Sequence, residues 1–360
     1  MTMPVDKRPA DDPAPATAGG APAVLAEPEE LPDDQRLPAW RRVVAGSNFQ
    51  IGLTLVALIV VFSILHFNEF TSADNARNIA TDAAVLLVLG TGMTFVIITA
   101  GIDLSVGGVL VFAGVVAAKV MNSAGGDGWP TLLLGLGAAL GCGLGWGALN
   151  GFLVARAKIP ALIVTLGTLG MSLGGALLIT GGVDEREVPT KLITDIGIGR
   201  VGGQVPYLVL IAFAVALVGG ILLAFTRFGR YTYAIGSNEE AVRRAGVSVT
   251  GHLVKVYALA GVLAGLAGYL SLARFGTTTV GGHNTDNLQA IAAVVIGGTS
   301  LFGGVGTVLG TVIGVFIPAV LQNGFVITGV QPFWQQIAVG AVLIAAVYLD
   351  QLRRSKVNRR

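Results

Sequence analysis

The sequence predicts an all-α, polytopic membrane protein with about ten transmembrane helices, some of them broken or re-entrant, and with both termini in the cytoplasm. Of the 360 residues, 53% are hydrophobic and 12% are charged, whereas a soluble domain has about 25% charged residues. The mean hydropathy is +0.74. Long uncharged stretches recur along the chain, and this pattern is typical of membrane-spanning helices and excludes a water-soluble fold.

The first 45 residues differ in composition from the rest. Eight of the 14 prolines lie within the first forty residues, among alanine and acidic residues. Such a segment cannot bury a core, so we expect a disordered cytoplasmic tail over 1–45. It lacks the apolar core of a signal peptide, so we expect it to stay attached. The transmembrane domain is expected over 46–352, with a basic cytoplasmic tail over 353–360.

Ten apolar segments follow from residue 50 onward. They lie near 50–67, 83–100, 106–121, 131–154, 161–181, 206–225, 253–273, 288–301, 303–323 and 333–349. A straight span needs about 20 residues, so the short segments at 106–121 and 288–301 predict broken or re-entrant helices. The chain has 52 glycines, about twice the usual ~7% share, and this predicts closely packed helices.

The distribution of basic residues predicts the orientation. If the N-terminus is cytoplasmic and the spans alternate, 17 of the 23 Lys and Arg residues face the cytoplasm. This asymmetry follows the positive-inside rule. An odd number of spans would place the basic C-terminal stretch RRSKVNRR on the outer side, so we expect an even number.

A single acidic residue interrupts the apolar stretch GMTFVIITAGIDLSVGGVLVF (92–112). A carboxylate near the centre of a bilayer is costly and usually has a function. Around Asp103, the residues Gly101, Ser105 and Gly107 predict a helix break, with a new helix starting near Val106. A break leaves backbone N–H groups unpaired, and Asp103 or Ser105 can cap them. Capping is the role we favour for Asp103.

Little in the chain indicates catalysis. It has no Walker A pattern, and GIGRVG (197–202) matches a dinucleotide-binding pattern without the strand and helix that such a site needs. The histidines at 66, 252 and 283 have no metal-ligand spacing, and Cys142 has no partner for a disulfide. Apart from Asp103, the acids fall in tails, loops or span ends. We therefore expect no catalytic site, metal or cofactor in this chain, and a net charge of +2 gives no indication of nucleic-acid binding.

The longest cytoplasmic segment between spans is TRFGRYTYAIGSNEEAVRRAGVSVTGHLVK (226–255). Ser237 followed by Glu240 predicts a capping box at a helix start. Glu239 and Glu240 each precede an arginine by four residues, in the favourable order for ion pairs. Gly246 can end the helix in the left-handed conformation. These features predict a helix of about two turns near 238–245, which is short enough to need a docking partner.

Four stretches, in this order, resemble a known family: AGIDLSVGG, LNGFLVARAKIPALIVTLGT, RFGRYTYAIGSNEEAVRRAGVSV and AIAAVVIGGTSLFGGVGTVLGT. Together they are similar to the permease subunit of ribose-type ABC sugar importers, over roughly residues 45–352. The resemblance implies a non-catalytic transport subunit in a bacterial cell membrane that imports a monosaccharide (ribose-, xylose- or galactose-like) or a related polyol. It also implies a permease homodimer, a separate ATPase subunit and an extracytoplasmic sugar-binding protein.

The resemblance also implies roles for particular residues. The loop helix resembles the coupling helix that docks on the ATPase, and its candidate residues are Gly236, Ser237, Asn238, Glu239, Glu240, Ala241, Arg243, Arg244 and Gly246. Candidates at helix breaks on the translocation pathway are Gly101, Asp103, Ser105, Gly107, Gly297, Gly298, Thr299 and Ser300. Polar side chains near the pathway, which we interpret mainly as packing groups, are Thr94, Thr99, Asn150, Thr165, Thr168, Asn287, Gln322 and Asn323. For Asp103, sugar contact or gating stays open beside capping.

Two other classes of function compete with the importer. One is a secondary transporter that uses Asp103 as a proton relay, and the other is a membrane-embedded enzyme. The lack of a second buried acid and the capped cytoplasmic helix favour the importer, while the enzyme lacks a recognisable set of catalytic residues. The outer loop 182–205 carries both charge signs, which suits a transient contact of Asp184, Glu185 and Glu187 with the binding protein. A loop that is only solvated is the alternative.

Overall fold

The computed structural model describes residues 47–283 and 285–331, together with six single positions between 334 and 348. The chain divides into two compact units, Met1–Val43 and Val44–Arg360, and all the described residues lie in the second. The expected tail over 1–45, most of the tenth apolar segment at 333–349 and the basic tail over 353–360 therefore lie outside the described residues.

Seven helices in the described part of the chain are long and apolar enough to cross a membrane. They are α4 (Ala73–Ile98), α5 (Val106–Ala124), α6 (Trp129–Ala155), α7 (Ala161–Thr180), α8 (Tyr207–Phe225), α11 (Val249–Phe275) and α13 (Val308–Ile327). Two further apolar helices, α2 (Ser47–Leu65) and α12 (Asp286–Ile296), offer shorter apolar stretches. The all-helical membrane fold is confirmed for this part of the chain, while the side on which each terminus lies stays a prediction.

The two segments expected to be short behave differently. α12 has 11 residues and so reaches about 16 Å, roughly half of a ~30 Å hydrocarbon core. The expectation for 106–121 is wrong, because α5 has 19 residues and reaches about 28 Å. The helix continues through Asn122 to Ala124, beyond the end of the apolar segment. The break expected near Asp103 is present, and α5 begins at Val106 as predicted.

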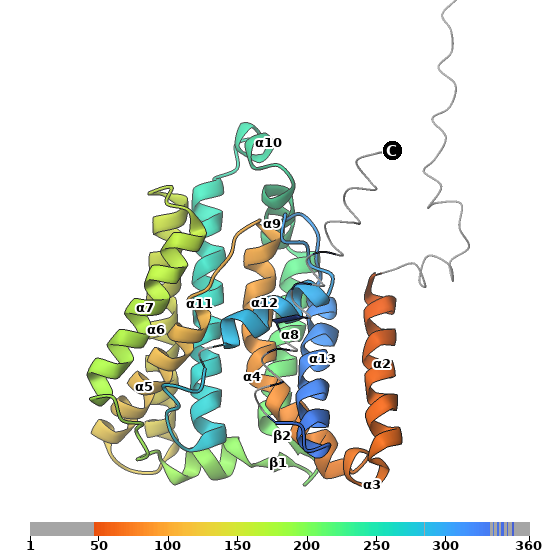
Figure 1. Cartoon of the computed structure of the whole chain (residues 1–360). Coiled ribbons are helices and arrows are strands. Elements are labelled where there is room, and N and C mark those ends of the chain that lie inside the picture. Colours follow the sequence, from red (N-terminus) through yellow and green to blue (C-terminus); the bar gives the residue numbers. More distant parts are fainter. Residues whose placement is uncertain are drawn as a thin grey trace, which may run out of the picture. The chain divides into compact units, whose positions relative to one another are not determined.

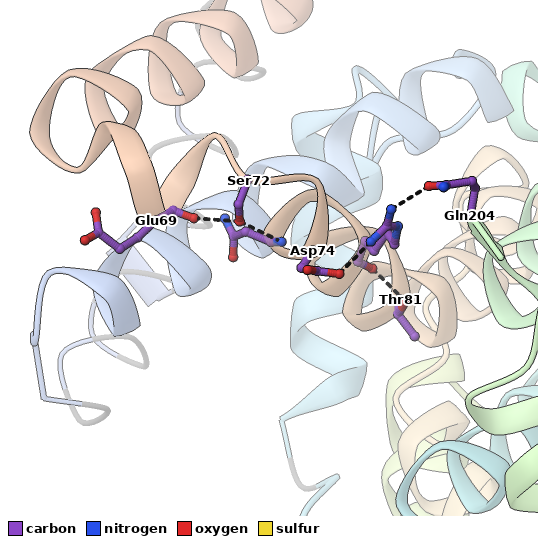
Figure 2. Close-up of polar contacts among 7 residues, drawn as sticks. Glu69, Ser72, Asp74, Thr81 and Gln204 are labelled. Atoms are coloured by element: carbon purple, nitrogen blue, oxygen red, sulfur yellow. Dashed lines mark hydrogen bonds and ion pairs between the residues drawn. The ribbon is translucent and has the colours of Figure 1, made fainter.

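α4 begins well before the apolar segment at 83–100. The Ser72 hydroxyl caps it by accepting a bond from a first-turn N–H group at 3.2 Å. In that part of the helix, Arg77 binds both Asp74 and Gln204, each at 2.5 Å (Figure 2). Gln204 lies in the turn between the two-residue strands β1 (Arg200–Val201) and β2 (Val205–Pro206). The polar start of α4 therefore contacts the hairpin formed by β1 and β2.

Glycine faces determine how α11 packs. α11 packs most extensively on α6, and a Cβ on Gly143 of α6 would lie only 2.1 Å from the carbonyl oxygen of Gly261 in α11. A Cβ on Gly265 would likewise lie 2.2 Å from the carbonyl oxygen of Ala139. Only a hydrogen at these positions allows the two backbones to approach, which is how small residues promote helix contact in membranes.

Polar segments gather at two opposite ends of the bundle. α9 (Arg227–Ser237) and α10 (Glu239–Arg244) lie at one end, beside the start of α11 (Figure 1). The π-helix η2 (Leu192–Gly197) packs against α11, and it lies with β1, β2 and α3 (Phe67–Phe70) at the other end (Figure 1). The 27 residues of α11 separate the ends by about 40 Å. We name them the α10 end and the η2 end.

Candidate functional site

The first feature of the site is the break between α4 and α5, over 99–105. Asp103 lies there and is 1% exposed. Its Oδ1 accepts a bond from the backbone N–H of Ser105 at 2.9 Å and another from the Ser105 hydroxyl at 2.6 Å. Ser105 directly precedes α5, so the carboxylate lies at a helix N-terminus, where the helix dipole favours an anion. Asp103 therefore bonds Ser105, the residue that precedes α5, whereas no side chain of the described residues bonds the first-turn N–H groups of α5. The capping role of Asp103 stays a prediction.

Three other helices bond to the same break. Tyr257 of α11 donates its hydroxyl to one carbonyl of the break at 3.4 Å, and Asn287 of α12 donates to another at 3.1 Å. Asn150 of α6 donates to the Ser105 hydroxyl at 2.7 Å. Polar backbone groups in a membrane are costly when unpaired, and here the protein itself pairs them. No basic side chain pairs with Asp103 among the described residues.

Gly101 and Gly107 have a steric role at this break. A Cβ on Gly101 would lie 2.8 Å from the Tyr257 hydroxyl, and one on Gly107 would lie 3.1 Å from the carbonyl oxygen of His283. Neither glycine has a positive φ. Close approach of neighbouring segments, not backbone conformation, therefore explains glycine at both positions.

The second break lies between α12 and α13, over 297–307, and contains the candidates Gly297, Gly298, Thr299 and Ser300. Gly298 has φ +84°, a left-handed conformation that favours glycine. Thr299 and Ser300 are buried. The cap of α13 is Thr307, whose hydroxyl accepts a bond from a first-turn N–H at 2.9 Å. The sequence analysis did not single out Thr307, although threonine before an apolar run is an N-cap signal.

The two breaks touch each other at the α10 end. The N–H of Gly304 in the second break donates to the carbonyl oxygen of Ile98, the last residue of α4, at 2.9 Å. Gly236 of α9 packs on this bond, since a Cβ there would lie 1.7 Å from the Ile98 oxygen and 2.6 Å from the Gly304 nitrogen. α9 is therefore in direct backbone contact with both breaks.

α9 itself was missed as a separate helix by the sequence analysis. The Tyr233 hydroxyl donates to a carbonyl of the second break, that of Gly306, at 2.6 Å, and burial raises the pKa of this phenol, which keeps it protonated as a donor. Thr232 hydrogen-bonds His252 of α11 at 2.9 Å. Phe228 packs on a phenyl ring of α4, with 5.9 Å between ring centroids. α9 is thus bonded to α4, α11 and the second break.

α10 is the short helix predicted near 238–245, with one correction. Ser237 does not cap it, because Ser237 ends α9 and its hydroxyl donates to the Tyr233 carbonyl at 2.9 Å. The N-cap residue is Asn238. Its Oδ1 accepts a hydrogen bond from the backbone N–H of Ala241, three residues later, at 2.9 Å. Gly246 has φ +82°, as predicted.

The surface of α10 is charged and open. Both predicted ion pairs are confirmed, Glu239 with Arg243 and Glu240 with Arg244, each at 2.5 Å. None of the helix residues is buried. Exposed pairs of this kind contribute little to stability, so α10 is a preformed helix whose faces are available to a partner.

The loop 182–205 at the η2 end makes contacts with other parts of the same chain. Asp184 accepts a bond from the backbone N–H of Val280 at 2.8 Å. Glu185 forms an ion pair with Lys119, and its side chain is only 14% exposed. For Glu187, no internal partner is found among the described residues. Of the three acids expected to contact a binding protein, Glu187 is therefore the one that the fold leaves available.

A metal site does not emerge from the described residues, among which no group of three or more His, Cys, Asp or Glu side chains converges. Cys142 is half-buried and packs against an apolar cluster between α5, α6 and α11. The site thus consists of helix breaks and of the segments that connect them.

The family model described as branched-chain amino acid transport system / permease component matches residues 75–347. The chain is 38% identical over 305 residues to the ribose import permease of Escherichia coli (strain K12), which covers 84% of this chain and 93% of that protein. It is 34% identical over 305 residues to the fructose import permease of Rhizobium meliloti, covering 83% and 84% of the two chains. It is 35% identical over 319 residues to the galactose/methyl galactoside import permease of Escherichia coli (strain K12), covering 84% and 94%. No solved structure shows a significant match to the chain.

Proposed function

The chain belongs to the family of branched-chain amino acid transport system permease components, and from this membership we propose that it is the membrane-spanning permease of an ATP-driven sugar importer. The cargo is a monosaccharide or a related polyol. Support for a sugar comes from relatives named for ribose, fructose and galactose import, which are 34% to 38% identical over more than four fifths of the chain. The permease resides in a bacterial cell membrane, with the α10 end facing the cytoplasm.

Two partner proteins complete this importer. A separate ATPase subunit docks on α10, which is exposed, capped at both ends and carries two ion pairs on its surface. An extracytoplasmic sugar-binding protein delivers the cargo at the η2 end, where Glu187 is an exposed acid on the outer loop. The polar rim of a transient interface has this character.

The observation that carries the mechanism is the contact of α9 with both helix breaks. A partner that displaces α10 also displaces α9, because the two helices are adjacent in sequence and in contact. α9 meets the ends of α4 and the second break at Gly236, without an intervening side chain. Movement at the α10 end is therefore passed to the points where α4, α5, α12 and α13 are discontinuous. Asp103 holds the start of α5 during this movement.

The importer contains two copies of this permease. α6 has a second glycine face besides the one packed on α11, formed by Gly137, Gly141 and Gly145 at intervals of four residues. A Cβ on any of these three would meet no atom within 4 Å in the described part of the chain. Open small-residue faces of this spacing suit close helix–helix contact in a bilayer, so a second copy is proposed to pack here.

The test is reconstitution. The permease is co-expressed with the ATPase subunit of its own transport system, purified through a tag on the permease alone, and placed in liposomes with the binding protein outside and ATP inside. We expect the ATPase to co-purify, and uptake of D-ribose, D-fructose or D-galactose to require ATP. A proton-coupled transporter, the alternative that uses Asp103, would instead take up sugar with a pH gradient and no ATP. Uptake that a pH gradient drives without ATP would overturn the proposal.

A further inference from the structure

A cavity with a partly polar wall lies between α4, α11, α12 and α13. Its volume is about 260 Å³, just below the range of ~300–1,000 Å³ that is usual for small-molecule sites. The polar part of its wall consists of Asp82, Arg274, His283, Asp286, Gln289 and Gln322. Arg274 is the second-last residue of α11, so the cavity belongs to the η2 end, which faces the sugar-binding protein in the proposed importer.

The charged groups of this cavity are matched to one another. Arg274 of α11 forms an ion pair with Asp82 of α4. The Nδ1 of His283 lies 2.6 Å from a carboxylate oxygen of Asp286, and its Nε2 lies 2.9 Å from the hydroxyl of Ser271. Both carboxylates of the cavity therefore already have a partner within the protein. A neutral ligand with many hydroxyl groups can bond to such pairs without separating them, because carboxylate oxygens keep free lone pairs.

The cavity also holds donors and acceptors that the protein does not use. Arg274 lines the cavity, and its Nε, which is buried within the protein, has no hydrogen-bond partner among the described residues. For the amide of Gln322, too, no partner is found in the described part of the chain. Gln289 makes one long side-chain bond, to Thr285 at 3.3 Å. These three side chains come from three different helices, α11, α13 and α12.

Two helix irregularities meet at this cavity. The half-length helix α12 begins at Asp286, on the cavity wall. Pro318 lies inside α13, also on the wall, and it has no N–H to bond the carbonyl four residues earlier. Half-helices and interrupted helices of this kind form substrate sites in membrane transporters, because their ends offer unpaired backbone groups. Apolar wall comes from Phe275, Val85 and Leu86.

We infer that this cavity is a transient binding site for the neutral monosaccharide after it leaves the binding protein and before it passes the helix breaks. Arg274, Gln289 and Gln322 donate to sugar hydroxyls, and Phe275 faces the apolar side of the sugar ring. The inference rests on the proposed function, since it names the residues of this chain that contact the imported sugar. Because both carboxylates of the cavity already have partners within the protein, we expect a neutral sugar to bind here in preference to a zwitterionic amino acid.

The test measures sugar binding to the purified permease without its partners. The full chain is placed in lipid nanodiscs, and saturation-transfer NMR is recorded on D-ribose, D-fructose and D-galactose, with L-leucine as the zwitterionic probe. We expect a signal from at least one sugar and none from L-leucine. The double variant Gln289→Leu/Gln322→Leu keeps the size of both side chains, and each lost hydrogen bond lowers affinity by roughly 3- to 10-fold. The matched control Gln331→Leu, at an exposed position that does not line the cavity, should bind as the wild type does.

Uptake by the complete importer separates failure of this site from failure of the proposed function. In the proposed importer, the binding protein determines the sugar concentration that gives half-maximal uptake. Gln322→Leu should therefore leave that concentration unchanged and lower the maximal uptake rate by roughly 3- to 10-fold. No NMR signal from a sugar that the wild-type importer takes up, or equal signals from the wild type and the double variant, would overturn the site and leave the importer standing. A signal from L-leucine alone, without uptake of any of the three sugars, would overturn both.

Discussion

Replacing Gly236 by alanine tests the contact between α9 and the two helix breaks. The new Cβ would lie 1.7 Å from the Ile98 oxygen, whereas non-bonded heavy atoms rest at roughly 3.5 Å. α9 or the end of α4 must therefore shift by about 1.8 Å. Overpacking of this kind costs about 1–3 kcal/mol. The shift also strains the bond from Gly304 to Ile98, 2.9 Å long, whose loss costs about 0.5–1.5 kcal/mol. Together these terms weaken the contact by roughly 2–4 kcal/mol.

The assay compares three properties of the Gly236→Ala complex with those of the wild type. Sugar uptake into liposomes should fall by at least a factor of about 10, because every 1.4 kcal/mol is tenfold in an equilibrium. The ATPase subunit should still co-purify, since α10 is exposed and unchanged, and ATP hydrolysis should continue without transport. The matched control is Gly52→Ala in α2, where an added Cβ meets nothing within 4 Å among the described residues. Wild-type uptake by Gly236→Ala would refute a rigid contact between α9 and the breaks.

Three further predictions concern the other parts of the site. Asp103→Asn should keep most sugar uptake, because the amide oxygen can still accept a hydrogen bond from Ser105. Asp103→Leu should reduce the amount of folded protein in the membrane. If Asp103→Asn abolishes uptake at a normal protein level, the charge itself has a role. Asn238→Ala should cost about 1 kcal/mol of α10 stability and weaken co-purification of the ATPase, and Asn238→Asp should restore it. Gly141→Cys in a Cys142→Ser background should form a disulfide-linked dimer in membranes under mild oxidation, and a chain that stays monomeric there would place the second copy elsewhere.

The coupling segment shows how far local sequence rules reach. The ion pairs of α10 and the left-handed Gly246 follow from spacing and residue type alone, and both are present. The capping residue was predicted one position too early, because Ser237 and Asn238 are both favourable caps and sit side by side. What decides between them is that α9 continues to Ser237, and α9 is held by Tyr233 bonding to a segment over 70 residues away in sequence. No local rule contains that contact.

Glycine and polar residues in the spans show the same difference between what the local sequence predicts and what only the tertiary contacts determine. Their number predicts close packing, but not which face of α6 meets α11 and which stays open. Among the polar side chains interpreted as packing groups, Thr94 does bond a threonine of α13 at 2.6 Å, and Asn323 bonds Asn75 of α4 at 2.8 Å. Asn150 and Asn287 instead close the break at Asp103, and Gln322 lines the cavity. These roles differ although the residues look alike in sequence, because the partner in each case comes from a distant helix.

The acidic residues show why hydropathy finds one kind of polar site and misses another. Asp103 stands out because apolar residues surround it in sequence and its bonding partners are neutral. Asp82 and Asp286 do not stand out, because each lies at or near the end of an apolar segment and is matched by Arg274 or His283. Hydropathy along the chain therefore identifies a carboxylate that is isolated among apolar residues. It does not identify charged residues that are paired between helices. Paired groups around an open cavity nevertheless suit a neutral, hydroxyl-rich cargo, since the carboxylate lone pairs stay available for hydrogen bonds. We therefore expect Asp103, the most visible acid, to hold the start of a helix, and Asp82 and Asp286 to lie where the sugar binds.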